Sequence, residues 1–309
     1  MEKLVSMISE EWKEKLERRQ YRIVGNHSAV STCKWMKESL RCGQYCYKQQ
    51  FYGIKSHRCL QMTPALLCNH RCLHCWRDNS HFSTEWEGPV DSPEKIVEES
   101  IEKHRDLLSG FGGNDEVQKE RLEESMNPDQ VAISLTGEPT MYPKISELIK
   151  EFHRRDFTTF LVTNGTLPER LKGLEEPPTN LYISLETATE EDYLEFNKPV
   201  REGLWEKLME SLDVVRDMDT RTVCRITAVE GYNMQEEKKF SELLERGEFD
   251  FVEVKGYMHV GDSMERLERD AMPEHDDVRD FAERITEQDN RYSVKDENQV
   301  SRVVLLKRD

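Results

Sequence analysis

Three closely spaced cysteines are the strongest chemical signal in the 309-residue sequence. Cys68, Cys72 and Cys75 are separated by three and then two residues, and they directly follow a short apolar segment at residues 61–67. Three thiolates in one tight loop can bind three irons of a [4Fe–4S] cluster, which leaves the fourth iron open to react. The alternative is a zinc site. Its fourth ligand would be one of three nearby histidines: His70, His74 or His81.

A second group of thiols precedes this loop. Cys33, Cys46 and Cys59 are separated by twelve residues each time, and they suggest a second [4Fe–4S] cluster with one iron free for a substrate. Cys42, four residues before Cys46, is an alternative ligand. In a reducing cytosol, clustered thiols are more often metal ligands than disulfides. The eighth cysteine, Cys224, lies in an apolar, β-branched segment, which predicts a buried structural thiol.

Polar residues follow several expected strands at the point where each strand ends. Gly137, Glu138 and Pro139 form a turn in which glycine permits close backbone approach, and a carboxylate or carbonyl oxygen there can hold a cationic amine. Asn164 and Ser184 lie at the ends of the next two expected strands. Either residue could equally cap a helix.

Short apolar, β-branched segments alternate with amphipathic segments along most of the chain from residue 61. This alternation predicts an α/β fold, a partial (βα)6 TIM-like barrel whose functional loops follow the strands. A zinc ribbon has no reason to lie at a strand end of such a chain, which favours the iron–sulfur interpretation. The expected strands are 61–67, 131–135, 157–162, 181–185, 222–229 and 249–254, and the expected helices are 9–20, 143–155, 190–197, 203–217 and 235–246.

Three stretches depart from this simple alternation. Residues 21–59 have no sustained period and are interpreted as a structured segment held by ligands. Residues 91–125 begin with a helix-start signature and form a largely helical excursion, either a lid or a long connection. The C-terminal region is expected to continue the alternation, and the acidic run Asp276, Asp277 and Asp280 is expected to be a solvated helix face.

The charge and hydropathy of the chain limit its partners. Lys and Arg total 44 and Asp and Glu total 61, so the formal charge is −17 at pH 7. A nucleic-acid partner would therefore need a locally basic face. The mean hydropathy is −0.79, and no apolar stretch is long enough for a transmembrane helix. The N-terminal sequence lacks the apolar core of a secretory signal, so we expect a cytoplasmic protein.

The cysteine loop resembles the cluster loop of the radical S-adenosylmethionine (SAM) superfamily. This resemblance implies that SAM chelates the open iron and that an electron then cleaves SAM to a 5′-deoxyadenosyl radical. The turn at residues 136–139 resembles the Gly-Gly-Glu motif that receives the SAM ammonium group. His74 stands where that superfamily usually has a larger residue packed on the adenine. The implied SAM-binding residues are Gly137, Glu138, Pro139, Asn164, Ser184 and His74.

Longer segments resemble the tRNA 4-demethylwyosine synthase family, over nearly the whole chain from about residue 30. The most discriminating is residues 251–257, Phe-Val-Glu-Val-Lys-Gly-Tyr. The other similar segments are 75–77, 84–86, 134–143, 160–164, 181–185, 221–227 and 272–275. The resemblance implies an N-terminal extension with auxiliary cysteines at residues 1–60, a radical SAM core at 61–235 and a wyosine-specific region at 236–309.

The family resemblance also implies a reaction. N1-methylguanosine beside the anticodon of tRNA-Phe would condense with pyruvate, through a radical on its methyl group, to give tricyclic 4-demethylwyosine. Cys33, Cys46 and Cys59 would bind the second cluster, with Cys42 spare. Lys48 would hold pyruvate as a Schiff base, because a desolvated lysine can be nucleophilic near neutral pH. On spacing alone, Lys48 would be a surface residue.

Partners and rival functions follow from the same comparison. The sequence has no flavodoxin-like domain of the kind some family members carry, so we expect an external electron donor of the flavodoxin or ferredoxin type. Basic residues expected to contact tRNA are Arg77, Arg225 and Lys255, with Arg154 and Arg155 as the next candidates. One rival is another radical SAM enzyme with an auxiliary cluster, although such enzymes commonly carry auxiliary cysteines after the core. The other is a non-catalytic iron–sulfur or zinc protein.

Overall fold

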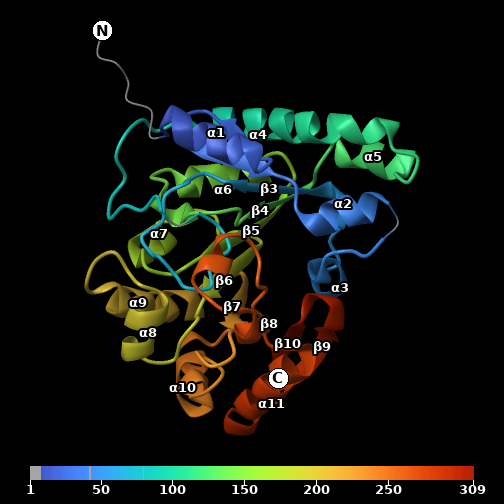
Figure 1. Cartoon of the computed structure of the whole chain (residues 1–309). Coiled ribbons are helices and arrows are strands. Elements are labelled where there is room, and N and C mark those ends of the chain that lie inside the picture. Colours follow the sequence, from blue (N-terminus) through green and yellow to red (C-terminus); the bar gives the residue numbers. More distant parts are fainter. Residues whose placement is uncertain (1–7, 42, 79) are drawn as a thin grey trace. The chain divides into compact units, whose positions relative to one another are not determined.

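The computed structural model describes residues 8–41, 43–78 and 80–309, so Cys42 lies outside the described residues. The chain divides into two compact units. Figure 1 shows the elements of the chain coloured by residue number. The first unit contains Met1–Leu67, Glu85–Leu161 and Gly173–Thr179. The second unit contains Cys68–Thr84, Val162–Lys172 and Asn180–Asp309. Each unit is therefore assembled from several separate stretches of chain.

A mixed sheet forms the centre of the first unit. Its strands are β1 (Arg22–Val24), β2 (Ser28–Ser31), β3 (Cys59–Thr63), β4 (Gln130–Ile133) and the first residues of β5 (Thr158–Thr163). β1, β2 and β3 pair antiparallel, whereas β3, β4 and β5 pair in parallel. All four residues of β4 are buried, as expected for a parallel strand with both faces covered.

The helices of this unit include the long excursion that the sequence predicted. They are α1 (Glu10–Arg18), α2 (Lys34–Leu40), α3 (Tyr47–Tyr52), α4 (Pro93–Leu108), α5 (Lys119–Ser125) and α6 (Ile145–His153). Ser92 caps α4 through its hydroxyl, and Pro93 occupies the first turn. The buried face of α4 packs against α6, β1 and β2. Residues 91–125 are therefore a packed connection between β3 and β4, and the alternative of a lid is not supported.

The strands of the second unit also include parallel and antiparallel pairs. β6 (Asn180–Ser184), β7 (Arg221–Ala228) and β8 (Phe251–Gly256) pair in parallel, as predicted. The prediction that the β/α alternation continues to residue 309 is wrong, because β9 (Tyr292–Asn298) and β10 (Val303–Arg308) form an antiparallel pair and β10 also pairs antiparallel with β8. The short connection between β9 and β10 leaves no room for a crossover helix.

The helices of the second unit precede or connect these strands along the sequence. They are α7 (Pro168–Lys172), α8 (Glu190–Phe196), α9 (Leu204–Arg216), α10 (Glu237–Gly247) and α11 (His275–Gln288). The acidic run lies on α11, where Asp276 and Asp280 are exposed and Asp277 forms a capping box with Glu274. The prediction of a solvated face is confirmed. Cys224 in β7 is fully buried, as predicted.

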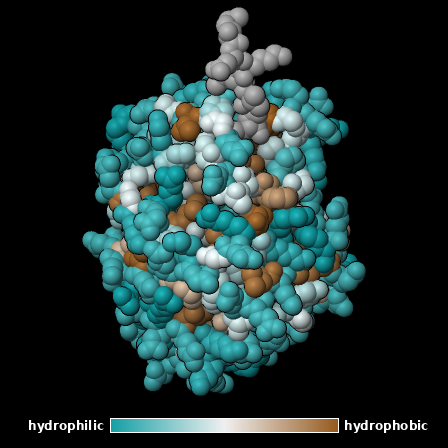
Figure 2. All heavy atoms as spheres, turned by 90° about the vertical axis from the view of Figure 1, so that its left-hand side faces the viewer, coloured by the Kyte–Doolittle hydropathy of each residue, from teal (hydrophilic) through white to brown (hydrophobic). Residues whose placement is uncertain are grey.

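The surface agrees with the low mean hydropathy. Hydrophilic residues cover most of the face in Figure 2, and hydrophobic residues occur there in small, separate groups. Within the described part of the chain, none of the helices combines the length and apolarity that crossing a bilayer requires.

A buried histidine should make the first unit sensitive to acid. His104 on α4 is buried, its Nε2 lies 3.0 Å from the carbonyl oxygen of Ser125, and burial lowers its pKa to about 4. Below the unfolded pKa of 6.5, His104 binds a proton in the unfolded chain but stays neutral in the folded chain. The free energy of unfolding therefore falls as the pH drops toward 4. This group contributes a loss of up to about 3 kcal/mol.

Urea unfolding of wild type and His104→Gln at neutral and mildly acidic pH measures this contribution. We expect the variant to lose less free energy of unfolding on acidification than the wild type does. Identical acid-dependent losses in the two proteins would contradict the assignment.

Candidate functional site

The first unit brings three predicted cysteine ligands together. Cys33 is the N-cap of α2, Cys46 is the N-cap of α3, and Cys59 is the first residue of β3. Burial raises the pKa of the Cys59 thiol, and the negative charges of Cys33 and Cys46 raise it further. These electrostatic effects place the three thiols near one another, in keeping with the regular spacing of the cysteines along the sequence.

Lys48 lies beside this group of thiols. It follows Cys46 on α3, is only 8% exposed, and its Nζ lies 4.6 Å from the ring centroid of Phe160. Its positive charge lowers the pKa of Cys59, opposing the effect of burial and of the other two thiols. The alternative that Lys48 is a surface residue is therefore wrong. Few lysines are buried without a specific role for the amine.

The turn after β4 is held against the chain that follows β3. Gly137 has φ +69°, and a Cβ placed on it would lie 2.0 Å from the carbonyl oxygen of Ala65 and 2.6 Å from that of Leu67. The Glu138 N–H donates to the Leu67 carbonyl oxygen at 2.8 Å. The turn therefore needs glycine at position 137 both for its backbone conformation and for space.

The Glu138 carboxylate has local partners within this turn. Its Oε1 accepts hydrogen bonds from the N–H and the hydroxyl of Thr140, at 3.0 and 2.6 Å. These bonds cap the 3₁₀ turn Pro139–Met141. The sequence left open whether a carboxylate or a carbonyl oxygen holds a cationic amine here. Because one carboxylate oxygen already accepts two hydrogen bonds, the main-chain carbonyls of the turn are the better candidates.

The second unit holds the cysteine loop. Burial raises the pKa of Cys72, and the charges of Cys75 and Cys68 raise it further, so these three thiols also form a close group. The Asn197 amide donates to the Cys72 sulfur at 3.7 Å. Backbone hydrogen bonds fasten the loop to the end of α8 and the residues after it, including one from Leu73 N–H to the Phe196 carbonyl at 2.9 Å.

Two of the nearby histidines, His70 and His74, have protein partners. His70 Nε2 lies 2.6 Å from the Tyr193 hydroxyl, and burial lowers the pKa of His70 to about 3. The His74 ring stacks on Phe196 with centroids 5.0 Å apart. Across residues 8–41, 43–78 and 80–309, no three His, Cys, Asp or Glu side chains form a group that could hold a metal ion.

Glu186 is a site residue that the sequence reasoning missed. It is 6% exposed, it accepts a hydrogen bond from Thr227 N–H at 2.6 Å, and it lies 3.5 Å from His74 Nε2. Burial alone would raise its pKa, but attraction to His74 and these hydrogen bonds hold the pKa below its usual value. Its position two residues after Ser184, beyond a strand end, is the signal that could have identified it.

Asn164 and Ser184 both lie in the second unit. Asn164 donates to the Asn69 side chain at 2.7 Å and accepts from Thr166, so it ties the cysteine loop to the end of β5. It caps no helix, because α7 begins only at Pro168. Ser184 is the last residue of β6 and is half-buried. It pairs across the sheet with Arg225 of β7.

The basic residues expected to contact RNA have protein partners. Lys255 donates to the Ser301 carbonyl at 2.8 Å, and the Arg77 guanidinium lies 3.5 Å from the Trp76 ring centroid. Arg225 is close enough to Glu186 to lower its pKa. Arg154 and Arg155 both bond to the buried carboxylate of Glu151. Their contact with RNA stays a prediction.

Comparison with known proteins identifies relatives over the whole chain. Residues 62–244 match the radical SAM superfamily, and residues 246–308 match a family described as wyosine base formation. A protein of Pyrococcus horikoshii named S-adenosyl-L-methionine-dependent tRNA 4-demethylwyosine synthase is 48% identical over 96% of this chain and 88% of its own length. A human protein of that name, TYW1, is 36% identical over 97% of this chain and 41% of its own length.

Two solved structures are also similar. One, described as TYW1 with a lysine–pyruvate adduct bound, is 37% identical, has a TM-score of 0.89, and is matched over 98% of this chain and 97% of its own. The other, an archaeal TYW1, is 35% identical with a TM-score of 0.79 over 97% and 96% of the two chains. These matches confirm the predicted fold class, the partial (βα)6 TIM-like barrel of the radical SAM type.

Alanine at position 137 should damage the turn after β4. It would force a left-handed φ on a residue with a Cβ and place that Cβ against the Ala65 carbonyl, so we expect Gly137→Ala to lower the free energy of unfolding by about 3 kcal/mol or more. Gly231 is a matched control, with φ +75° and no heavy atom of the described residues within 4 Å. Gly231→Ala should cost about 1 kcal/mol. Equal losses in denaturant unfolding would show that the close approach is unimportant.

Proposed function

The chain belongs to the family of S-adenosyl-L-methionine-dependent tRNA 4-demethylwyosine synthases within the radical SAM superfamily, and we propose that its two groups of thiols divide the reaction between them. The enzyme condenses N1-methylguanosine of tRNA-Phe with pyruvate by a radical mechanism to form 4-demethylwyosine. The observation that carries the proposed division is the buried amine of Lys48 beside three electrostatically coupled thiols, separate from the cysteine loop. Neither rival function explains this arrangement.

Cys68, Cys72 and Cys75 are the ligands for the cluster that the radical SAM family requires. With SAM bound, that cluster supplies the electron that cleaves SAM and starts the radical reaction. Asn197 donates a hydrogen bond to the Cys72 sulfur and orients it. The backbone bonds of the loop to the segment after α8 hold these sulfurs in place before any cofactor binds.

Separate groups of residues bind the parts of SAM in this proposal. The main-chain carbonyls of the turn formed by Gly137, Glu138 and Pro139 accept from the SAM ammonium group. Asn164 and Ser184 contact the ribose and carboxylate. The His74 ring packs on the adenine, and its stacking on Phe196 fixes the orientation of the imidazole.

Cys33, Cys46 and Cys59 hold the second cluster in this proposal, and Lys48 holds pyruvate. The Lys48 amine adds to the ketone carbon of pyruvate and water leaves, which gives an imine. A relative described with a lysine–pyruvate adduct supports this assignment. Covalent attachment fixes the acceptor carbon, which supplies the proximity that a radical addition needs. The reaction then requires that the methylated guanosine leave its stack.

The remaining partners follow from this reaction. The tRNA is held by a locally basic face in spite of the net charge of −17, with Arg77, Arg225 and Lys255 as candidates. Electrons come from an external donor of the flavodoxin or ferredoxin type. The enzyme works in the cytoplasm, where a reducing environment preserves the thiols.

Iron content tests the two groups of thiols. Two clusters should give about eight irons per chain after anaerobic reconstitution, and replacing Cys33, Cys46 and Cys59 together by alanine should leave about four. Cys224→Ala is a matched control that should retain about eight, because Cys224 is a buried thiol outside both groups. A wild-type content near four that survives the triple replacement would eliminate the second cluster.

Activity assays test the division of labour. Cys72→Ala should abolish formation of 5′-deoxyadenosine, because it removes a ligand of the SAM cluster. Cys46→Ala should retain some 5′-deoxyadenosine formation while losing the tricyclic product. Parallel loss of both products in both variants would argue against separate roles.

Borohydride trapping tests the role of Lys48. Reduction in the presence of labelled pyruvate should fix label on the wild type but not on Lys48→Arg, since a guanidinium is a poor nucleophile at neutral pH. Lys55→Arg is a matched control, because Lys55 is an exposed lysine of the same unit, and it should trap label like the wild type. Peptide mapping that finds the label on a different lysine would remove Lys48 from this role.

A further inference from the structure

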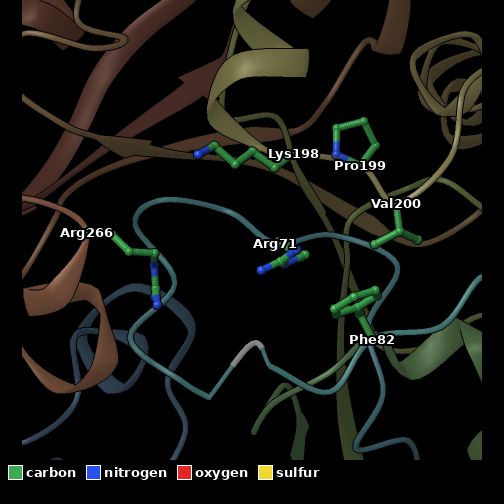
Figure 3. A pocket seen from close by; sticks show the side chains of 6 residues that line it. All are labelled: Arg71, Phe82, Lys198, Pro199, Val200 and Arg266. Atoms are coloured by element: carbon green, nitrogen blue, oxygen red, sulfur yellow. The ribbon is translucent and has the colours of Figure 1, made fainter.

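A cavity of about 390 Å³ lies in the second unit against the cysteine loop (Figure 3). It is lined by three basic side chains and three apolar ones: Arg71, Lys198, Arg266, Phe82, Pro199 and Val200. Figure 3 shows the basic side chains around one hollow, with Phe82 beside Arg71. Its volume lies at the lower end of the range for small-ligand sites, which suits one nucleotide better than a folded segment.

Backbone hydrogen bonds fix the walls of this cavity. The Arg71 N–H donates to the carbonyl oxygens of Asn197 and Lys198, both at 3.1 Å, and the Val200 N–H donates to Asn69 at 3.0 Å. On the other side, Cys68 and Phe82 form a β-bridge. The cavity is therefore preformed, so little ordering of the chain is needed when a ligand binds.

Two of the cations lack a carboxylate partner. Arg71 and Lys198 are exposed, and no Asp or Glu of the described residues forms an ion pair with either. Lys198 also has φ +46°, a strained conformation for a residue with a Cβ. Acidic residues outnumber basic ones in this chain, 61 to 44, so acidic partners are abundant. Unpaired cations that line one cavity indicate an anionic ligand.

The apolar wall adds an aromatic surface. Phe82 is 44% exposed, and the Arg71 guanidinium lies 4.7 Å from its ring centroid. A guanidinium beside an exposed ring is the combination that binds a phosphate and an unstacked base of single-stranded RNA. Arg266 donates to the carbonyl oxygens of Leu73 and Cys75, so the third cation of the cavity is also bonded to the cysteine loop.

We propose that this cavity binds one unstacked nucleotide of the substrate tRNA, with Arg71 and Lys198 on its phosphate and Phe82 against its base. The inference rests on the proposed function, because it takes tRNA as the source of the phosphate. A free nucleotide or inorganic phosphate has the same anionic chemistry. The RNA is favoured because the cavity is open to solvent at exposed residues and adjoins the loop that the reaction uses.

Binding of an anticodon stem–loop RNA that carries N1-methylguanosine tests the proposal on the reconstituted holoenzyme. Lys198→Gln should weaken binding about threefold to tenfold and reduce the slope of log Kd against log salt by about 0.7 to 0.9, the value of one phosphate contact. Phe82→Leu should weaken binding about fivefold or more with the slope unchanged, because stacking involves no counterions. Lys198→Arg should bind like the wild type.

Lys307→Gln is the matched control, because it removes an exposed lysine of β10 that has no ion-pair partner in the described chain. Its RNA affinity and salt slope should equal those of the wild type. Iron content and the unfolding midpoint of each sample identify any variant that fails to fold. If a variant fails to fold, binding of the RNA to the wild-type holoenzyme is measured in its place, with AMP added as a competitor. AMP should displace the RNA only weakly at millimolar concentration.

Three outcomes would overturn the proposal. Unchanged RNA affinity in both Lys198→Gln and Phe82→Leu would place the RNA elsewhere. Tight binding of AMP or phosphate, lost in Lys198→Gln without a change in RNA affinity, would assign the cavity to a free anion. A raised KM for SAM with unchanged RNA affinity would assign it to SAM. Formation of 4-demethylwyosine by the wild type is scored separately, so a failure of the proposed function is distinguishable from a failure of this site.

Discussion

The burial and crowding of thiols in two groups is the constraint on which both units depend. Burial and neighbouring thiols raise the pKa of Cys59 in the first unit and of Cys72 in the second. Positive charges oppose this effect locally: Lys48 lowers the pKa of Cys59, and Arg266 and Arg77 lower that of Cys75. The rest of each unit supplies the rigidity that keeps like charges together. Without it, the thiols would separate and could no longer bind one cluster together.

Most of that rigidity comes from the backbone. The cysteine loop has no regular secondary structure, so its N–H and carbonyl groups need partners elsewhere. They find them in the segment after α8, while in the first unit the turn at Gly137 lies against the chain after β3. These contacts fix the functional loops in place, which suits sites that must be ready before a ligand arrives.

The sequence predicted the strands that belong to the regular strand–helix alternation. It did not predict the features that depend on contacts between residues far apart in the chain. β4, β6 and β7 lie within two residues of their predicted bounds, because buried parallel strands are continuous apolar runs. β1, β2, α2 and α3 are too short to show a period, so residues 21–59 looked irregular. Asn197 and the basic cavity join residues far apart in the sequence, and no local pattern marks them, whereas Glu186 is marked only by its position beyond a strand end. Lys48 was identified by family resemblance, since its burial is a property of the fold alone.

The interleaving of the two units limits how the protein can be divided. Residues 64–129 separate β3 from β4, although these strands pair directly, and residues 68–84 within that connection belong to the second unit. Bringing the ends of so long a connection together lowers the chain entropy before the stabilising contacts between the two strands can form. This order of events slows folding. Each unit also draws on three stretches of chain. Neither half can therefore be expressed as one contiguous gene fragment, and a single proteolytic cut cannot release either of them intact.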